Sequence, residues 1–101
     1  FAEYFPRYRV PFEPPLQFRL ADILHRYGWF EVAVRALEAI VDDPSASAQW
    51  VERSLFKLAK FLDEMGLREA ARFRYKQLLE RFPEFPDREL VQYKIKLLTS
   101  A

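Results

Sequence analysis

LAKFLDEMGLREAARFRYKQLL, residues 58–79, decides the fold of this chain because its pattern occurs once before in the sequence. The earlier copy is LADILHRYGWFEVAVRALEAIV, residues 20–41. When Gly28 is aligned on Gly66, the pattern Leu-Ala-x2-Leu-x3-Gly recurs before each glycine, and an alanine follows each glycine five residues later. Internal repetition of this kind predicts one helical unit that is used twice.

Glycine and proline divide the rest of the chain into segments. The only two glycines separate apolar-periodic stretches, and all seven prolines lie outside the predicted helix interiors. Five helices are predicted, at residues 15–27, 29–41, about 45–65, 67–82 and 88–98. Ser45 or Ser47 is expected to cap the third helix, and Asp87 is expected to cap the fifth. Because no strand signal is present, we expect an all-α fold of antiparallel helix pairs.

Apolar residues at helical spacing mark one face of the first and last predicted helices. In the first helix this face is made of Leu16, Leu20, Ile23, Leu24 and Tyr27. In the last helix it is a wide arc made of Leu90, Val91, Tyr93, Ile95, Leu97 and Leu98. Lys94 falls inside this arc.

Composition restricts the classes of protein that the chain can represent. It has 101 residues, half of them hydrophobic, which indicates one folded domain and not a disordered chain. Lys and Arg number 16 against 15 for Asp and Glu, a balance that argues against a nucleic-acid-binding or membrane-surface protein. There is no cysteine, and no apolar run approaches the roughly 18–20 residues of a membrane span. The chain opens at Phe1, so we expect a piece of a longer protein. The sequence does not identify its compartment, and the cytoplasm and a bacterial periplasm or envelope both stay open.

The repeated pattern resembles the tetratricopeptide repeat, a helix–turn–helix unit with small residues where its helices touch. The resemblance implies a short superhelix of stacked pairs, with repeats at about 14–47 and 52–85 and a capping helix at about 87–98. The glycines are 38 residues apart, against about 34 in the family, so we expect an added helical turn carrying Trp50. Gln17 and Leu55 stand where the family often has Trp. An unrelated small helical bundle is the alternative.

Residues 82–86, Phe-Pro-Glu-Phe-Pro, form the joint before the last helix. This joint is similar to the aromatic-Pro-x-x-Pro joints in tetratricopeptide proteins of bacterial cell envelopes. The similarity implies that the chain belongs to a larger bacterial protein.

The resemblance also implies a partner-binding surface along the concave face, which the first helix of each pair lines. The corresponding positions are Phe18, Asp22, His25, Arg26, Arg53, Phe56, Lys60, Asp63 and Glu64. Aromatic and charged residues together suit a peptide or protein partner, although Phe18 and Phe56 could instead pack against a neighbouring helix. The family's carboxylate clamp uses Asn, and this chain has none, so recognition of that kind is not expected.

No catalytic, metal or cofactor site is predicted. His25 is the only histidine, and a lone histidine without cysteine does not make an ordinary metal site. No nucleophile-like serine and no glycine-rich phosphate loop is present. Arg68, Arg72 and Lys76 recur at four-residue steps, and a solvated outer face explains them better than an RNA-binding stripe.

Residues 1–14 form a proline-containing arm that we expect to be mostly extended. Its five aromatic residues are Phe1, Tyr4, Phe5, Tyr8 and Phe12. Three accounts remain open: the arm covers the first repeat, lies in a groove of its own or of a neighbouring molecule, or links to a membrane or another domain. Intramolecular covering is the favoured account because so many aromatics are unfavourable in water.

The functional expectation is a non-catalytic protein–protein interaction module that binds a peptide or protein segment. A self-association element, giving a homo-oligomer, is the alternative from a different class. An RNA-binding helical repeat is a third reading. A membrane would be reached only through missing parts of the parent chain.

Overall fold

The computed structural model describes residues 14–99, and residues 1–13 and 100–101 lie outside the described part. Of the predicted arm, only Pro14 is described, and it begins the first helix. The described residues form five helices and no strand, which confirms the predicted all-α class. The helices are α2 (Pro14–Arg26), α3 (Phe30–Val41), α4 (Ala48–Glu64), α5 (Arg68–Arg81) and α6 (Arg88–Thr99). None of these helices combines the length and apolar character needed to cross a bilayer.

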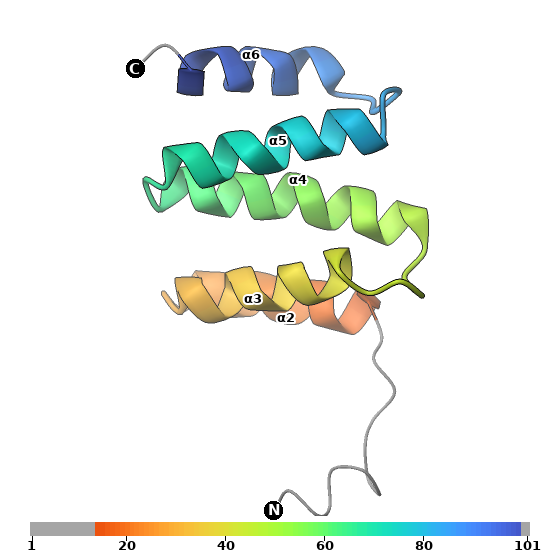
Figure 1. Cartoon of the computed structure of the whole chain (residues 1–101). Coiled ribbons are helices and arrows are strands. Elements are labelled where there is room, and N and C mark those ends of the chain that lie inside the picture. Colours follow the sequence, from red (N-terminus) through yellow and green to blue (C-terminus); the bar gives the residue numbers. More distant parts are fainter. Residues whose placement is uncertain (1–13, 100–101) are drawn as a thin grey trace, which may run out of the picture.

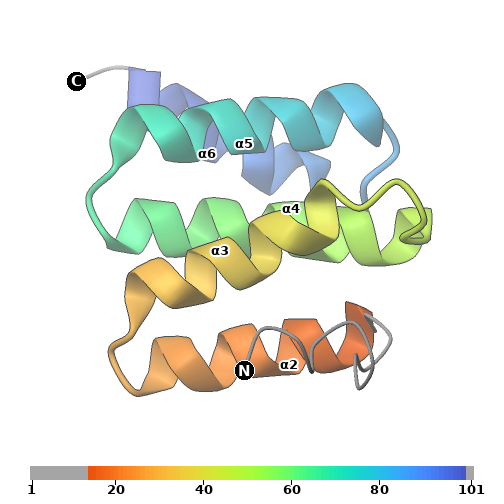
Figure 2. The same cartoon turned by 60° about the horizontal axis from the view of Figure 1, so that its bottom comes forward.

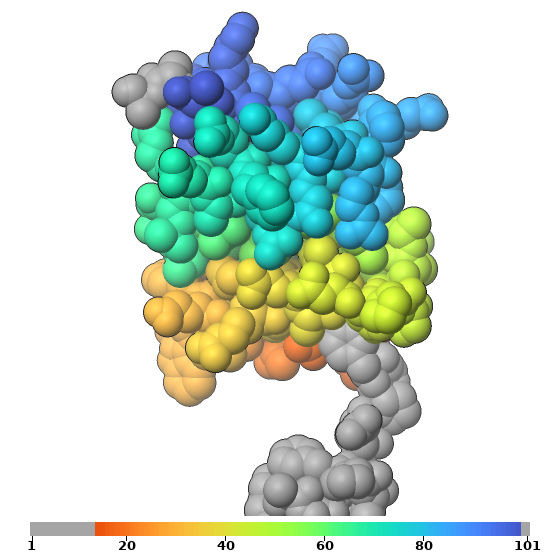
Figure 3. All heavy atoms as spheres, in the orientation of Figure 1, coloured from red at the N-terminus to blue at the C-terminus, as the bar shows by residue number. Residues whose placement is uncertain are grey.

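The helices form an antiparallel stack in which each one packs against the next along the chain (Figure 1). In addition, α2 touches α4, and the rotated view shows α4 near the middle of the stack (Figure 2). The space-filling view shows the sequence colours in successive bands, with α2 and α3 at one end and α6 at the other (Figure 3). The α2–α3 and α4–α5 pairs are therefore consecutive layers of one array.

The two glycines end α2 and α4 with the same turn. Gly28 has φ +85° and Gly66 has φ +80°, a conformation that costs other residues more because of their Cβ. The N–H of Trp29 donates to the Leu24 carbonyl at 2.9 Å, and Gly28 donates to His25 at 3.1 Å. The corresponding bonds after α4 measure 3.0 Å each. Both turns are therefore Schellman motifs, which satisfy carbonyls that the helix end leaves unpaired.

Small residues allow close approach inside each pair. The alanines that recur in the repeat, Ala21, Ala33, Ala59 and Ala71, are all fully buried. Larger apolar side chains around them complete one continuous core, with Tyr75 the largest residue that is almost fully buried. The predicted close contacts at the alanine positions are confirmed.

The third predicted helix differs from expectation at its start. It begins at Ala48, and neither candidate serine caps it by its side chain: Ser47 holds the N-cap position without a side-chain bond. The backbone N–H and the hydroxyl of Ser45 instead both donate to Asp43, at 2.9 and 2.8 Å. Ser47 therefore holds a predicted N-cap position, but the predicted side-chain bond is absent, and Ser45 closes a local turn with Asp43. The carbonyl of Asp87 does receive the first bond of α6, from the Val91 N–H.

The added turn carries Trp50, as predicted: α4 has 17 residues against 13 in α2. The half-buried Trp50 ring lies 5.5 Å from the ring of Phe18 on α2. The extra turn therefore extends the contact between the first helices of the two pairs.

Candidate functional site

The nine predicted surface residues lie on α2 and α4. Six of them belong to two places, and Phe18, Arg26 and Arg53 lie outside both. One is the α2–α4 seam, which we define by Asp22, His25, Lys57, Phe61 and Glu64. The other is a pocket between α4, α5 and α6. Since Glu64 belongs to both, the two places are continuous along α4.

An ion pair between the two repeats lies at the centre of the seam. The Lys57 Nζ donates to Asp22 Oδ1 at 3.1 Å, and its charge lies 4.9 Å from the centre of the Phe18 ring. Arg26 adds a longer contact to Asp22, at 3.5 Å. The hydrogen bond from Lys57 is the largest influence on the carboxyl, and it lowers the pKa of Asp22 below its ordinary 3.8. The Phe18 ring packs between Trp50 and Lys57, which favours the alternative that Phe18 packs against a neighbouring helix.

Removing the cation of the seam is expected to change how stability depends on pH. The depressed pKa of Asp22 adds stability that is present above 3.8 and is lost as the pH falls through the lower, folded-state pKa. Lys57→Met keeps much of the apolar stem and removes the charge. We therefore expect the variant to lose less stability than the wild type between pH 6 and pH 3, as measured by urea unfolding at both pH values.

Lys60→Met is the matched control for this experiment. Lys60 is an exposed lysine on the same helix and has no carboxylate partner among residues 14–99. Its replacement should leave the acid-induced loss of stability unchanged. An identical loss for Lys57→Met and the wild type would contradict the role given to the ion pair.

His25 joins the repeats by stacking. Its ring lies 3.9 Å from the Phe61 ring at an interplanar angle of 10°, and it meets the edge of Phe30 at 5.2 Å. Its Nε2 lies 2.7 Å from Glu64 Oε1, so the tautomer with a proton on Nε2 donates to that carboxylate. His25 is thus a packing and bridging residue. Residues 14–99 hold no group of three or more His, Cys, Asp or Glu side chains placed to bind a metal ion.

The pocket has a volume of about 140 Å³. Its lining residues are Phe56, Lys60, Asp63, Glu64, Tyr75, Leu90 and Lys94. The apolar walls come from α4, α5 and α6 together, so the pocket exists only because the last helix packs on the second pair. Four of its residues were predicted from the sequence.

Charged groups surround the apolar walls of the pocket. Lys60 lies 5.3 Å from the centre of the Phe56 ring, and Lys94 lies 3.9 Å from Asp63. Burial, followed by the nearby negative charges of Asp63 and Glu64, raises the pKa of Tyr75 to about 12. The hydroxyl therefore stays protonated at neutral pH.

Sequence reasoning missed Lys57, Tyr75, Leu90 and Lys94 as members of the site. One signal was present: Lys94 interrupts the apolar arc of the last helix, and the structure places it at the pocket beside Asp63. Lys57 carried no such signal because its importance depends on the rotation of α4 relative to α2.

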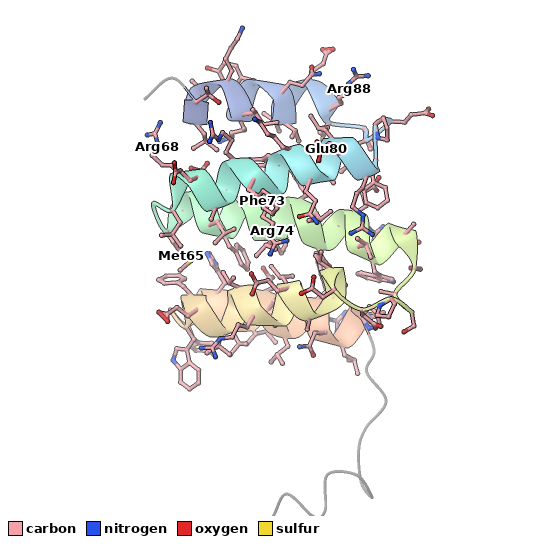
Figure 4. The ribbon with its side chains drawn as sticks, in the orientation of Figure 1. Met65, Arg68, Phe73, Arg74, Glu80 and Arg88 are labelled. Carbon is pink, nitrogen blue, oxygen red and sulfur yellow. The ribbon has the colours of Figure 1, made fainter. Side chains whose placement is uncertain are left out.

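The basic residues of α5 lie partly in contacts between helices. Arg68 donates to the Leu97 carbonyl of α6 at 3.2 Å, and Arg74 pairs with Glu38 of α3 at 3.1 Å. Figure 4 shows Arg74 pointing from α5 toward α3, and Arg68 beside the end of α6. Of the three basic residues at four-residue steps, Arg68 and Lys76 are exposed and Arg72 is partly exposed.

No family model, no curated protein and no solved structure matches this chain.

Proposed function

We propose that this chain is a non-catalytic protein–protein interaction module that binds a segment of a partner along α2, α4 and α6. The pocket between α4, α5 and α6 is the observation that carries the proposal. At about 140 Å³ it is smaller than the roughly 300–1,000 Å³ of sites for drug-sized ligands. It therefore suits one apolar side chain of a longer segment, and the remainder of that segment would lie on the surface alongside.

Charge on this face favours a segment with an acidic residue near its apolar anchor. The carboxylates of Asp22, Asp63 and Glu64 each already have a basic partner, in Lys57, Lys94 and His25. Two cations of α4 have no carboxylate partner among the described residues. They are Arg53, 5.1 Å from the Trp50 ring centre, and Lys60, over Phe56. Electrostatic complementarity of this kind favours specific and fast association.

The repeat supports placing the module among tetratricopeptide-like proteins. The same alanines are buried in both pairs, and the same glycine turn ends the first helix of each. On this proposal α6 is the capping helix, and its packing completes the pocket. The resemblance of the joint at residues 82–86 supports a larger bacterial parent protein.

Peptide display against the chain, followed by fluorescence anisotropy with the selected peptides, tests the proposal. Phe56→Ala/Lys60→Ala should weaken binding at least about tenfold, because truncating an anchor residue commonly costs more than about 1 kcal/mol. Phe73→Ala/Lys76→Ala is the matched control, since it removes the same residue types from exposed positions on α5 outside the pocket. Selected peptides that bind both double variants equally would contradict the pocket assignment.

A second candidate function is self-association, and exposed apolar residues on α6 favour it. Tyr93 is 58% exposed and Leu97 is 46% exposed. Light scattering over a dilution series would show a concentration-dependent mass if this candidate holds. A monomer at every concentration would remove it.

A further inference from the structure

One side of α2 is apolar and exposed. Leu16, Leu20, Ile23 and Tyr27 are 57%, 44%, 42% and 77% exposed, and their spacing places them in one line along the helix. We name these four residues the α2 stripe. The core side of the same helix holds Ala21, which is fully buried. Because α2 is the end helix of the stack, no described element covers the stripe (Figures 1 and 2).

The arm that precedes α2 has the composition to cover the stripe. In an extended segment alternate residues share a side, so Tyr4, Tyr8, Val10 and Phe12 fall on one side. Glu3, Arg7 and Arg9 fall on the other side, together with Phe1 and Phe5. An extended arm would therefore have one side without charges and one side that carries all three charged residues of positions 1–12, and the uncharged side is the better match for an apolar helix.

The arm also has the length and the attachment point that it needs to reach along the α2 stripe. Twelve extended residues span up to about 40 Å, whereas a helix of 13 residues is about 20 Å long. The arm joins α2 at Pro14, so a reversal there would lay it antiparallel along the whole stripe. Covalent attachment gives the arm a local concentration of about millimolar, which favours it over a separate chain.

We propose that residues 1–12 fold back along α2 and cover the α2 stripe with Tyr4, Tyr8, Val10 and Phe12. This inference goes beyond the proposed function and does not depend on it, because the stripe lies on the opposite side of the stack from the pocket helices. A second copy of the chain is the competing occupant, and the experiment separates the two.

A double-mutant cycle in the full chain tests the contact. Tyr8→Ser and Leu20→Ser should each lower the folding equilibrium constant by some factor. In the double variant the constant should fall by a factor at least about three times smaller than the product of the two single factors. Leu97→Ser takes the place of Leu20→Ser in a control cycle. Leu97 is a similarly exposed leucine, 46% exposed, on α6 at the other end of the stack. Tyr8→Ser with Leu97→Ser should be additive. Additivity of Tyr8→Ser with Leu20→Ser would overturn the proposal.

A photo-crosslinking amino acid in place of Val10 gives a second, direct measurement. The expected product is an intramolecular cross-link to residues 16–27, which include the α2 stripe, with a yield that does not change on dilution. The same amino acid in place of Phe5, which falls on the charged side of the arm, should cross-link to these residues several-fold less. Cross-links between two chains, or cross-links only to α4, α5 or α6, would overturn the proposal.

Discussion

Replacing Tyr75 by alanine is expected to lower the free energy of unfolding by about 3–5 kcal/mol, the usual cost of deleting a large buried aromatic side chain. Tyr75 is 1% exposed, and its ring centre lies 6.4 Å from that of Phe56. The stack therefore loses contacts between α4 and α5 and gains a cavity beside the pocket. Urea unfolding followed by circular dichroism measures the change.

Tyr75→Phe separates the ring from the hydroxyl. This substitution keeps nearly the same volume, so we expect a cost below about 1.5 kcal/mol. Equal losses for Tyr75→Phe and Tyr75→Ala would show that the hydroxyl, and not packing of the ring, determines the stability at this position.

Leu37→Ala is expected to lower the free energy of unfolding by about 2–5 kcal/mol. Leu37 occupies in the first repeat the position that Tyr75 occupies in the second, nine residues after the glycine, and it is fully buried. Because α3 packs on α4, a cavity in the first pair should destabilise the whole described array in one transition. Thermal unfolding by circular dichroism and by tryptophan fluorescence should therefore give coincident curves.

Leu67→Ala is the control for this experiment. Leu67 is 47% exposed, so its truncation should change the free energy of unfolding by no more than about 0.5 kcal/mol. Separate transitions for the two probes in Leu37→Ala would contradict the expected cooperative unfolding of the two helix pairs. Stacked repeats unfold separately when the interface between units is weak.

The helices and turns could be predicted from the sequence because their signals are local. Gly28 and Gly66 each end a helix where the pattern placed them, and the recurring alanines are buried. Periodicity shows which residues share a face, but it does not show which face another helix covers. That is why the apolar residues of α2 could be grouped from the sequence, although most of them turn out to be exposed.

The candidate site was predicted only in part because its geometry depends on three helices. The family resemblance led to Phe56, Lys60, Asp63 and Glu64 on α4, and these four line the pocket. The opposite walls come from α5 and α6, whose rotation about their own axes no local pattern reports. The same limit applies to the Lys57–Asp22 pair, which joins residues 35 positions apart.

The regular turn after α2 and α4 makes the array open to lengthening. The second pair packs on the first mainly through α3 and α4, α6 packs on α5, and the two glycines lie 38 residues apart. A third copy of residues 48–85, inserted before α6, would present to α6 the surface that it already contacts. The chain could thus be elongated by duplication of one gene segment, which would place α6 farther along the chain from α2.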